Sequence, residues 1–413
     1  MSDLSAKLRA WLVKPPGRPT FSGLPMPEMF RSPLAAAAGG RVVTTPCGPC
    51  VEFTQDMSVL ASDGPGLVTG FDRDKLRQAW QLIFGQDLPG SDGLRDVVFL
   101  DTETTGLGGA GAVVFLVGLG RIDGRGHFVI RQFFLEDYQY EPALLEALAE
   151  ELAGACAVCT YNGRAFDAPI IENRFVLNRR QNPLAGLVHF DLVYPARRLY
   201  RRQTQDCSLS TLENQVLGIA RDADVPGNIV PLLYQDYLAS RNPGPMAAVL
   251  AHNRQDVYSL FLLARQLVHE VTSPLESRHK SHRLDLGALL ERRQRLAEAA
   301  AVYELGLAEK TKGSEDFALT KERLSLLYKR LGQLDKAAAM WEEEVGQKSA
   351  RYLPYIELAK YLEHVRRSPS LALEVVATAR AHCMHDRWPA WVQADLERRY
   401  QRLARRMNSP PSP

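Results

Sequence analysis

The stretch Val97-Val-Phe-Leu-Asp-Thr-Glu103 decides the expected fold, because four apolar residues lead directly into two acidic ones. A short apolar run of this kind is typical of a buried strand. Residues two apart on a strand point to the same face, so the carboxylates of Asp101 and Glu103 project together. Like charges this close repel each other unless a cation neutralises them, and carboxylate oxygens suit Mg²⁺ or Mn²⁺. A surface acidic turn is the alternative interpretation.

The segments that follow alternate between strand-like and helix-like patterns. After the first strand we expect strands over 112–120 and 127–135, a helix over 141–152, a strand over 156–161 and a helix over 169–180. Further helices are expected at about 208–218, 231–240 and 245–270. This order of elements predicts a mixed α/β fold whose sheet has an antiparallel start.

Two more acidic residues occur in patterns of their own. Tyr161-Asn-Gly-Arg-Ala-Phe-Asp167 places Asp167 near the start of a helix, behind an Asn-Gly turn. The run His252-Asn-Arg-Gln-Asp256 has helical period, and residues four apart share a helix face. His252 and Asp256 therefore point at one site. A helix cap at Asp167 and a surface ion pair between His252 and Asp256 are the alternatives.

The order and spacing of these three motifs resemble those of the DEDD 3′–5′ exonuclease superfamily. The sequence is still more similar to the bacterial YprB-like ribonuclease-H-like family, because it also contains His189-Phe-Asp-Leu192, Cys207-Ser-Leu-Ser-Thr-Leu-Glu213 and Asp224-Val-Pro-Gly227. The resemblance covers about residues 95–270 well, the helical region after them loosely, and the residues before them little. It implies an α/β ribonuclease-H-like exonuclease domain, a mixed sheet flanked by helices, over residues 94–273.

The resemblance also implies an activity, a metal-dependent 3′–5′ exonuclease that hydrolyses phosphodiester bonds of DNA or RNA. Two divalent cations, Mg²⁺ or Mn²⁺, would lie about 4 Å apart. Their expected ligands are Asp101, Glu103, Asp167 and Asp256. The superfamily's general base is a tyrosine four residues before the last aspartate or a histidine five before it. His252 is a histidine in the tyrosine position, so we expect it to be catalytic, either through a water or by orienting the site.

Substrate contacts are expected mainly from a basic segment, in which four arginines surround Tyr200. The arginines could grip phosphates while the tyrosine ring stacks on a base. A solvated helix face is the alternative. The expected substrate-binding residues are Thr104, Asn162, Arg164, Arg197, Arg198, Arg201 and Arg202.

The two ends of the chain have different compositions. Residues 1–93 are rich in Pro, Gly, Ala and Ser, and we expect a partly disordered N-terminal arm with a small hairpin of residues 42–45 and 50–53. The chain becomes helical after Pro274. There Leu296-Ala-Glu-Ala-Ala-Ala-Val-Tyr303 matches Leu334-Asp-Lys-Ala-Ala-Ala-Met-Trp341, and a looser copy starts near Pro369.

Such a period fits stacked helix pairs, so we expect tetratricopeptide-like (TPR-like) helical repeats over residues 280–405. A plain amphipathic bundle is the alternative. Repeats of this kind bind a protein segment in a concave groove, so a protein partner is expected beside nucleic acid. The tail, residues 406–413, is expected to be disordered.

The bulk composition is that of an ordinary globular protein. The 413 residues are 46% hydrophobic and 24% charged, with a net charge of +2, so contact with nucleic acid needs a local basic patch. No apolar run approaches the ~20 residues of a membrane helix, and the first residues lack the apolar core of a signal peptide. We therefore expect a cytoplasmic protein that does not bind membranes.

Two other functions are compatible with these motifs. The chain could be a nucleic-acid-binding or adaptor protein with a vestigial nuclease site, in which the helical repeats carry the function. It could also keep the ribonuclease-H-like fold and cut internally. The four intact acidic residues favour the exonuclease.

Overall fold

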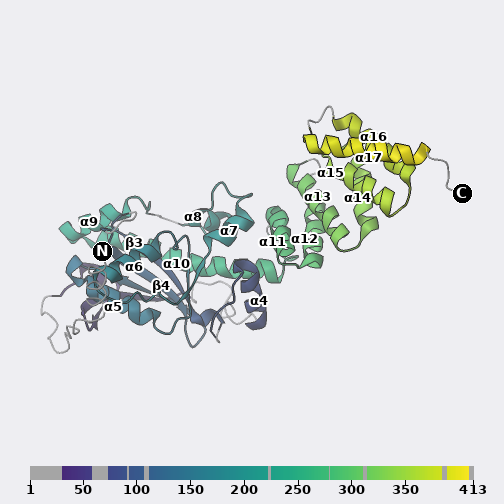
Figure 1. The fold of residues 1–413 in the computed structure, drawn as a ribbon. Coiled ribbons are helices and arrows are strands. Elements are labelled where there is room, and N and C mark those ends of the chain that lie inside the picture. The colour runs from purple at the N-terminus through teal and green to yellow at the C-terminus, as the bar shows by residue number, and fades with distance from the viewer. Residues whose placement is uncertain are drawn as a thin grey trace, which may run out of the picture. The chain divides into compact units, whose positions relative to one another are not determined.

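In the computed structural model, the residues described are 30–57, 73–90, 93–106, 111–221, 225–278, 280–309, 314–383 and 388–408. The chain divides into two compact units, Met1–Val268 and His269–Pro413 (Figure 1). The disorder expected within residues 1–93 and in the tail falls largely outside the described ranges. Residues 406–408, which we expected in the tail, belong to the last helix.

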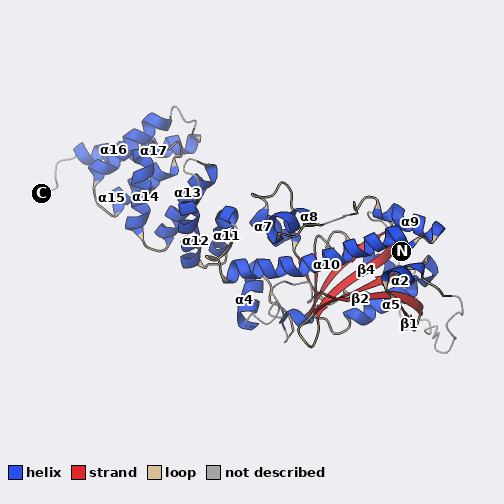
Figure 2. Cartoon of the chain, turned by 180° about the vertical axis from the view of Figure 1, so that it is seen from behind, coloured by secondary structure: helices blue, strands red, loops and turns tan. Residues whose placement is uncertain are grey.

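A mixed sheet forms the centre of the first unit, shown in red in Figure 2. Its described strands are β1 (Arg41–Thr45), β2 (Gly48–Asp56), β3 (Val97–Thr104), β4 (Val114–Ile122), β5 (Phe128–Phe134), β6 (Ala157–Thr160) and β7 (Val188–Asp191). They are arranged in the order β1-β2-β5-β4-β3-β6-β7. The pairs from β1 to β3 are antiparallel, whereas β3, β6 and β7 run parallel. The mixed α/β fold class expected from the sequence is thus confirmed.

The hairpin of β1 and β2 is part of this sheet, whereas we expected it in a separate N-terminal arm. Val51 in β2 pairs with Phe134 in β5, and Val51 is fully buried. Phe53 is also buried, at 6% exposure. These apolar side chains are removed from water only when the hairpin joins the edge of the sheet, which stabilises the joined arrangement.

Helices cover the sheet. In the first unit they are α2 (Pro33–Ala38), α4 (Arg73–Phe84), α5 (Glu141–Leu152), α6 (Asp167–Leu177), α7 (Val193–Tyr200), α8 (Leu209–Leu212), α9 (Val230–Ser240) and α10 (Pro243–Thr272, up to Val268). A single wider helical turn, Glu213–Leu217, follows α8. Helices α2 and α4 were not expected, and a helix in the segment of α7 was expected only under the alternative interpretation. Trp80 of α4 is fully buried, and its ring packs edge-on against Phe190 of β7 at 5.1 Å.

Helix α10 lies close against β4, as both overall views show. The approach depends on two glycines of β4. A Cβ at Gly118 would lie 2.3 Å from Oδ1 of Asn253, and one at Gly120 would lie 2.8 Å from Val257. A side-chain Cβ atom could not come this close to another atom. The two glycines therefore let α10 lie near enough to β4 for its side chains to reach the neighbouring strand β3.

The second unit is helical throughout its described residues, as expected. Its helices are α11 (Arg283–Arg292), α12 (Leu296–Glu309), α13 (Glu315–Arg330), α14 (Leu334–Gly346), α15 (Leu353–His364), α16 (Pro369–Cys383) and α17 (Ala390–Asn408), with a short turn of helix, Lys280–His282, before them. Consecutive helices pack against each other. The matched copies in the sequence begin α12, α14 and α16, and both Tyr303 and Trp341 are buried. None of the described helices is both long and apolar enough to cross a membrane.

Candidate active site

Asp101 and Glu103 lie in the second half of β3, where the strand leaves the apolar core and burial becomes partial. The amide of Asn253 on α10 donates to Oδ2 of Asp101 at 2.8 Å. The pairing register with β4 shifts between Glu103 and Thr104. Irregularities of this kind bend a strand and change the direction of side chains, and they are common beside active sites.

Asp167 is the first residue of α6 and is 9% exposed. Thr102, which lies between the two acidic residues of β3, donates from its hydroxyl to Oδ1 of Asp167 at 2.5 Å. The end of β3 therefore contacts the acidic residue of α6 on one side and, through Asn253, helix α10 on the other.

The turn before α6 is held by a buried acidic residue, Asp191, at the end of β7. Its carboxylate accepts hydrogen bonds from the backbone N–H groups of Asn162 at 2.7 Å, Arg164 at 3.2 Å and Val193 at 3.1 Å. Asn162 has a left-handed backbone, with φ of 62°, which asparagine tolerates better than most residues. Asp191 thus fixes the loop that leads to Asp167.

His252 and Asp256 lie one turn apart on α10, as the spacing of the motif predicted. Nε2 of His252 is 3.4 Å from Oδ2 of Asp256 and 3.7 Å from Oε1 of Glu103. The three side chains are only 13–15% exposed. The imidazole therefore joins the acidic residue of the helix to the acidic residue of the strand.

The carboxylates affect one another's charge, and the clearest case is Asp101. Burial raises the pKa of Asp101 well above its ordinary range, and the charges of Asp256, Asp167 and Glu103 raise it further. Burial also raises the pKa of Asp167 to about 6, and it raises that of Asp256 although His252 and Arg221 act in the opposite direction. Four negative charges in one buried place are unfavourable in the protein alone.

Arg221 is a component of this site that the sequence did not reveal. Its guanidinium pairs with both oxygens of Glu213, at 2.6 and 2.8 Å, and with Oδ1 of Asp256. A further N–H lies 3.1 Å from Nδ1 of His252. Glu213 is fully buried and also accepts from the hydroxyl of Ser259. The cluster therefore contains a cation of its own beside Asp256.

The donor set fits divalent cations in its chemistry, because carboxylate oxygens are the ligands that Mg²⁺ and Mn²⁺ prefer. A cation would also relieve the repulsion that raises the pKa of Asp101. As placed, however, no three His, Cys, Asp or Glu side chains within the described ranges surround one point as metal ligands. The carboxylates of Asp101, Asp167 and Asp256 each accept hydrogen bonds from protein donors instead.

The residues expected to bind substrate lie in two places. Thr104 donates to the carbonyl oxygen of Gly106 at 2.7 Å, at the end of β3, and the backbone of Asn162 belongs to the turn described above. The remaining residues are exposed arginines of the turn before α6, of α7 and of the turn after α7, namely Arg164, Arg197, Arg198, Arg201 and Arg202. Arg164 and Arg198 line one pocket together.

Tyr200, expected to stack on a base, does not fit that role because it is fully buried. Helix α7 begins at Val193, and this start turns Leu199 and Tyr200 toward the core. The exposed aromatic residue of α7 is Tyr194, at 53% exposure.

Comparison with known families matches residues 98–268 to the family described as the RNase_H superfamily. The match begins in β3 and ends in α10, so it contains the four carboxylates and His252. Among curated proteins, the chain is 33% identical over 320 residues to the uncharacterized protein YprB of Bacillus subtilis (strain 168). The aligned residues are 75% of this chain and 74% of that protein.

Proposed function

The chain belongs to one family with YprB of Bacillus subtilis and contains a domain of the RNase_H superfamily, and we propose that it is a nuclease whose reaction takes place at the carboxylate cluster. The finer assignment is a 3′–5′ exonuclease of the DEDD type acting on DNA or RNA. The observation that carries the proposal is the convergence of β3, α6 and α10, where the contacts of Thr102, Asn253 and His252 bring together Asp101, Glu103, Asp167 and Asp256.

Asp101, Glu103, Asp167 and Asp256 would hold two divalent cations, Mg²⁺ or Mn²⁺. When bound, such ions lower the pKa of an attacking water and stabilise charge on the leaving oxygen. The protein's own groups prepare the ligands. Asn253 fixes the carboxylate of Asp101 and Thr102 fixes that of Asp167, because a hydrogen bond from a packed neighbour restricts the rotamers of a ligand.

His252 is proposed as the residue that orients the carboxylates. Arg221 remains protonated and has only donors, so Nδ1 of His252 accepts from it and a neutral imidazole carries its proton on Nε2. That proton faces Glu103 and Asp256. In this arrangement Nε2 already carries the proton and cannot take one from water, so His252 becomes a base only if Arg221 leaves Nδ1.

The arginines of α7 and the following turn, with Thr104, Asn162 and Arg164, are proposed to contact the strand. Arg197, Arg201 and Arg202 are exposed and suit phosphate contacts, which position nucleic acid without reading its sequence. The second unit is proposed to consist of TPR-like helix pairs that bind a protein segment. The repeat that starts α12, α14 and α16 supports this assignment.

The proposal is tested by incubating the full chain with end-labelled single- and double-stranded DNA and RNA, in Mn²⁺ or in EDTA. We expect Mn²⁺-dependent release of nucleotides from the 3′ end, and a loss of at least about a hundredfold in Asp101→Ala and Asp167→Ala. Asp236→Ala, at an exposed acidic residue of α9, is the matched control.

The outcome separates the candidate functions. Full activity in Asp101→Ala would rule out the carboxylate cluster as the reacting site. Opening of a circular substrate would identify an endonuclease, since an exonuclease needs an end. Binding of nucleic acid with no turnover in Mn²⁺ would favour an adaptor with a vestigial site.

A further inference from the structure

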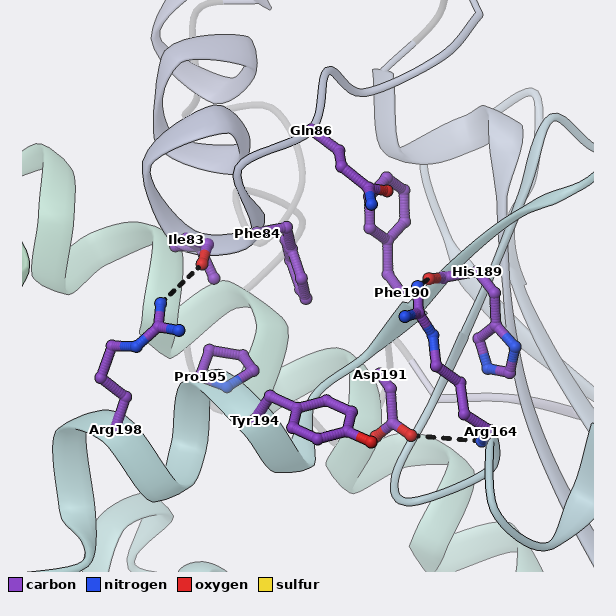
Figure 3. Close-up of a pocket in the computed structure, with 10 residues that line it drawn as sticks. All are labelled: Ile83, Phe84, Gln86, Arg164, His189, Phe190, Asp191, Tyr194, Pro195 and Arg198. Atoms are coloured by element: carbon purple, nitrogen blue, oxygen red, sulfur yellow. Dashed lines mark hydrogen bonds between the residues drawn. The ribbon is translucent and has the colours of Figure 1, made fainter. Parts of the chain in front are cut away.

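A pocket of about 260 Å³ opens beside the turn that leads to Asp167, between the end of α4, β7 and α7 (Figure 3). Its lining residues are Ile83, Phe84, Gln86, Arg164, His189, Phe190, Asp191, Tyr194, Pro195 and Arg198. Ile83, Phe190, Asp191 and Pro195 are buried. The exposed residues are Gln86, Arg164, Tyr194 and Arg198. The pocket therefore has a largely apolar floor and a polar, positively charged rim.

The floor is aromatic and firmly held. The ring of Phe84 lies 4.8 Å from that of Phe190, which also packs against the buried Trp80. Tyr194 adds a further ring, and a tyrosine that is 53% exposed is not needed for the core. A slot lined by aromatic rings suits a flat ring, because stacking occurs on any aromatic face.

The rim carries two guanidinium groups on opposite sides of Tyr194, as Figure 3 shows. Arg164 donates to the carbonyl oxygen of His189, and Arg198 donates to that of Ile83 at 3.5 Å. These bonds orient the two side chains at the rim of the pocket. A guanidinium has five N–H donors in a plane and matches phosphate oxygens.

Asp191, the acidic residue in the pocket, already has a structural role. The carboxylate of Asp191 accepts three backbone N–H groups. Those bonds connect the pocket to the carboxylate cluster, because they hold the turn that ends at Asp167. The negative charge of Asp191 also raises the pKa of Asp167. A group bound in the pocket is therefore adjacent to the segment that carries one of the four acidic residues.

Part of the pocket comes from outside the matched family region. Ile83, Phe84 and Gln86 belong to α4 and the loop after it, whereas the match to the RNase_H superfamily begins at residue 98. Helix α4 thus adds to the sheet a wall that the superfamily match does not include.

We propose that this pocket takes one unpaired nucleobase of the substrate strand, with the neighbouring phosphates on Arg164 and Arg198. The inference rests on the proposed nuclease function and adds a preference for single strands. A base in a duplex is stacked and paired, and entering the pocket would cost the free energy of unpairing it. An unpaired base gains stacking on Tyr194 and Phe84 without that cost.

The test measures binding without hydrolysis, so it does not depend on catalysis. The full chain in EDTA is titrated into a labelled single-stranded oligonucleotide and into the corresponding duplex. We expect Tyr194→Ala to raise the Kd for the single strand by about 5- to 150-fold, the range that loss of one base stack gives, and to leave duplex binding unchanged. Tyr194→Phe keeps the ring and should bind as the native chain does.

The matched control is Tyr138→Ala, since Tyr138 is similarly exposed, at 47%, and lies in a separate short helical turn. A Kd in Tyr194→Ala equal to that in Tyr138→Ala would overturn the proposal. An equal loss for single strand and duplex would overturn it as well.

Competition identifies the group that the pocket recognises. We expect adenosine monophosphate to displace the oligonucleotide from the native chain at a lower concentration than inorganic phosphate or ribose 5-phosphate, and to lose this advantage in Tyr194→Ala. If inorganic phosphate competed as well as adenosine monophosphate, the pocket would be a site for phosphate alone, which would contradict the proposal. If the native chain hydrolyses nucleic acid and Tyr194→Ala binds normally, the pocket assignment alone fails.

Discussion

The carboxylate cluster at the end of β3 and the pocket beside β7 and α4 are built in opposite ways. The cluster gathers charges of one sign in a buried place, where the pKa values of Asp101, Asp167 and Asp256 are raised. The pocket places Arg164 and Arg198 at an exposed rim above an apolar floor. Because its carboxylates are buried, the cluster depends on a counter-ion. Because the arginines of the pocket are exposed to water, their charges destabilise the fold little.

In our proposal, the cluster carries out the reaction and the pocket binds the substrate, and the two regions should respond differently to substitution. Carboxylates that repel each other in a buried site are stabilised by cations, so substitutions there should change both reactivity and the stability of the fold. Exposed arginines and Tyr194 contribute little to folding, so substitutions there should change affinity alone.

The largest effect on stability is expected at Arg221, the cation already present in the cluster. Arg221→Gln leaves the buried Glu213 without its bidentate partner, and breaking a buried ion pair from one side costs about 3–5 kcal/mol. The measurement is urea unfolding of the full chain, followed by circular dichroism. The double variant Glu213→Gln/Arg221→Gln should recover the part of the loss that comes from Glu213, because that side chain no longer carries an unpaired charge.

Asp256→Asn is the companion variant. It removes the second carboxylate that Arg221 contacts and keeps the pair with Glu213, and it relieves the repulsion between Asp256 and Asp101, so it should destabilise the fold much less than Arg221→Gln. Equal stability of the native chain and Arg221→Gln would show that Arg221 does not support the cluster.

The sequence predicted the carboxylates because each lies in a local pattern. Asp101 and Glu103 follow an apolar strand, and His252 and Asp256 share a helix face, so periodicity alone gave their direction. Arg221 was missed because its contacts join residues 8 and 35 positions away and its own surroundings have no periodicity.

The error at Tyr200 has a related cause. The composition identified the basic segment but did not show where α7 begins. The sequence therefore did not predict which side chains of the helix face the core. Beginning at Val193, the helix turns Tyr200 inward and leaves Tyr194 and Arg198 outside. The place of the β1–β2 hairpin was missed for the same kind of reason, since its partner β5 lies about 80 residues further along the chain.

A second, smaller effect is expected from pH in the absence of metal. The folded protein holds a proton on Asp167 up to a pKa of about 6, above the ordinary value of 3.8. The folded state therefore binds more protons than the unfolded state between these values, and stability falls as pH rises. The contribution of Asp167 to stability in EDTA should be greatest below about pH 4 and should decrease through about pH 6, by on the order of 1–3 kcal/mol. Asp101 and Asp256 act in the same direction.

The pH effect is checked by thermal unfolding across this range, with Asp167→Asn as the control that should flatten the profile. Mn²⁺ should restore stability most strongly above pH 6, because the carboxylates are charged there and can bind the ion. An ion that binds only the folded state stabilises the folded state. If stability did not fall relative to that of Asp167→Asn between about pH 4 and pH 6 in EDTA, the unfavourable charge assigned to the cluster would be contradicted.

The smallest effects are expected at the exposed arginines, and they complete the contrast with the cluster. Arg197, Arg201 and Arg202 are exposed, and each phosphate contact with a single strand contributes about −0.7 to the slope of log K against log salt. Replacing one of them with alanine should reduce the slope by about that amount and leave unfolding unchanged. Arg125→Ala is the matched control, because Arg125 is 75% exposed and lies in the turn between β4 and β5. If the variants at Arg197, Arg201 and Arg202 all kept the native slope, the strand would have to follow a path that avoids α7, and the pocket beside α4 would lose its connection to the substrate.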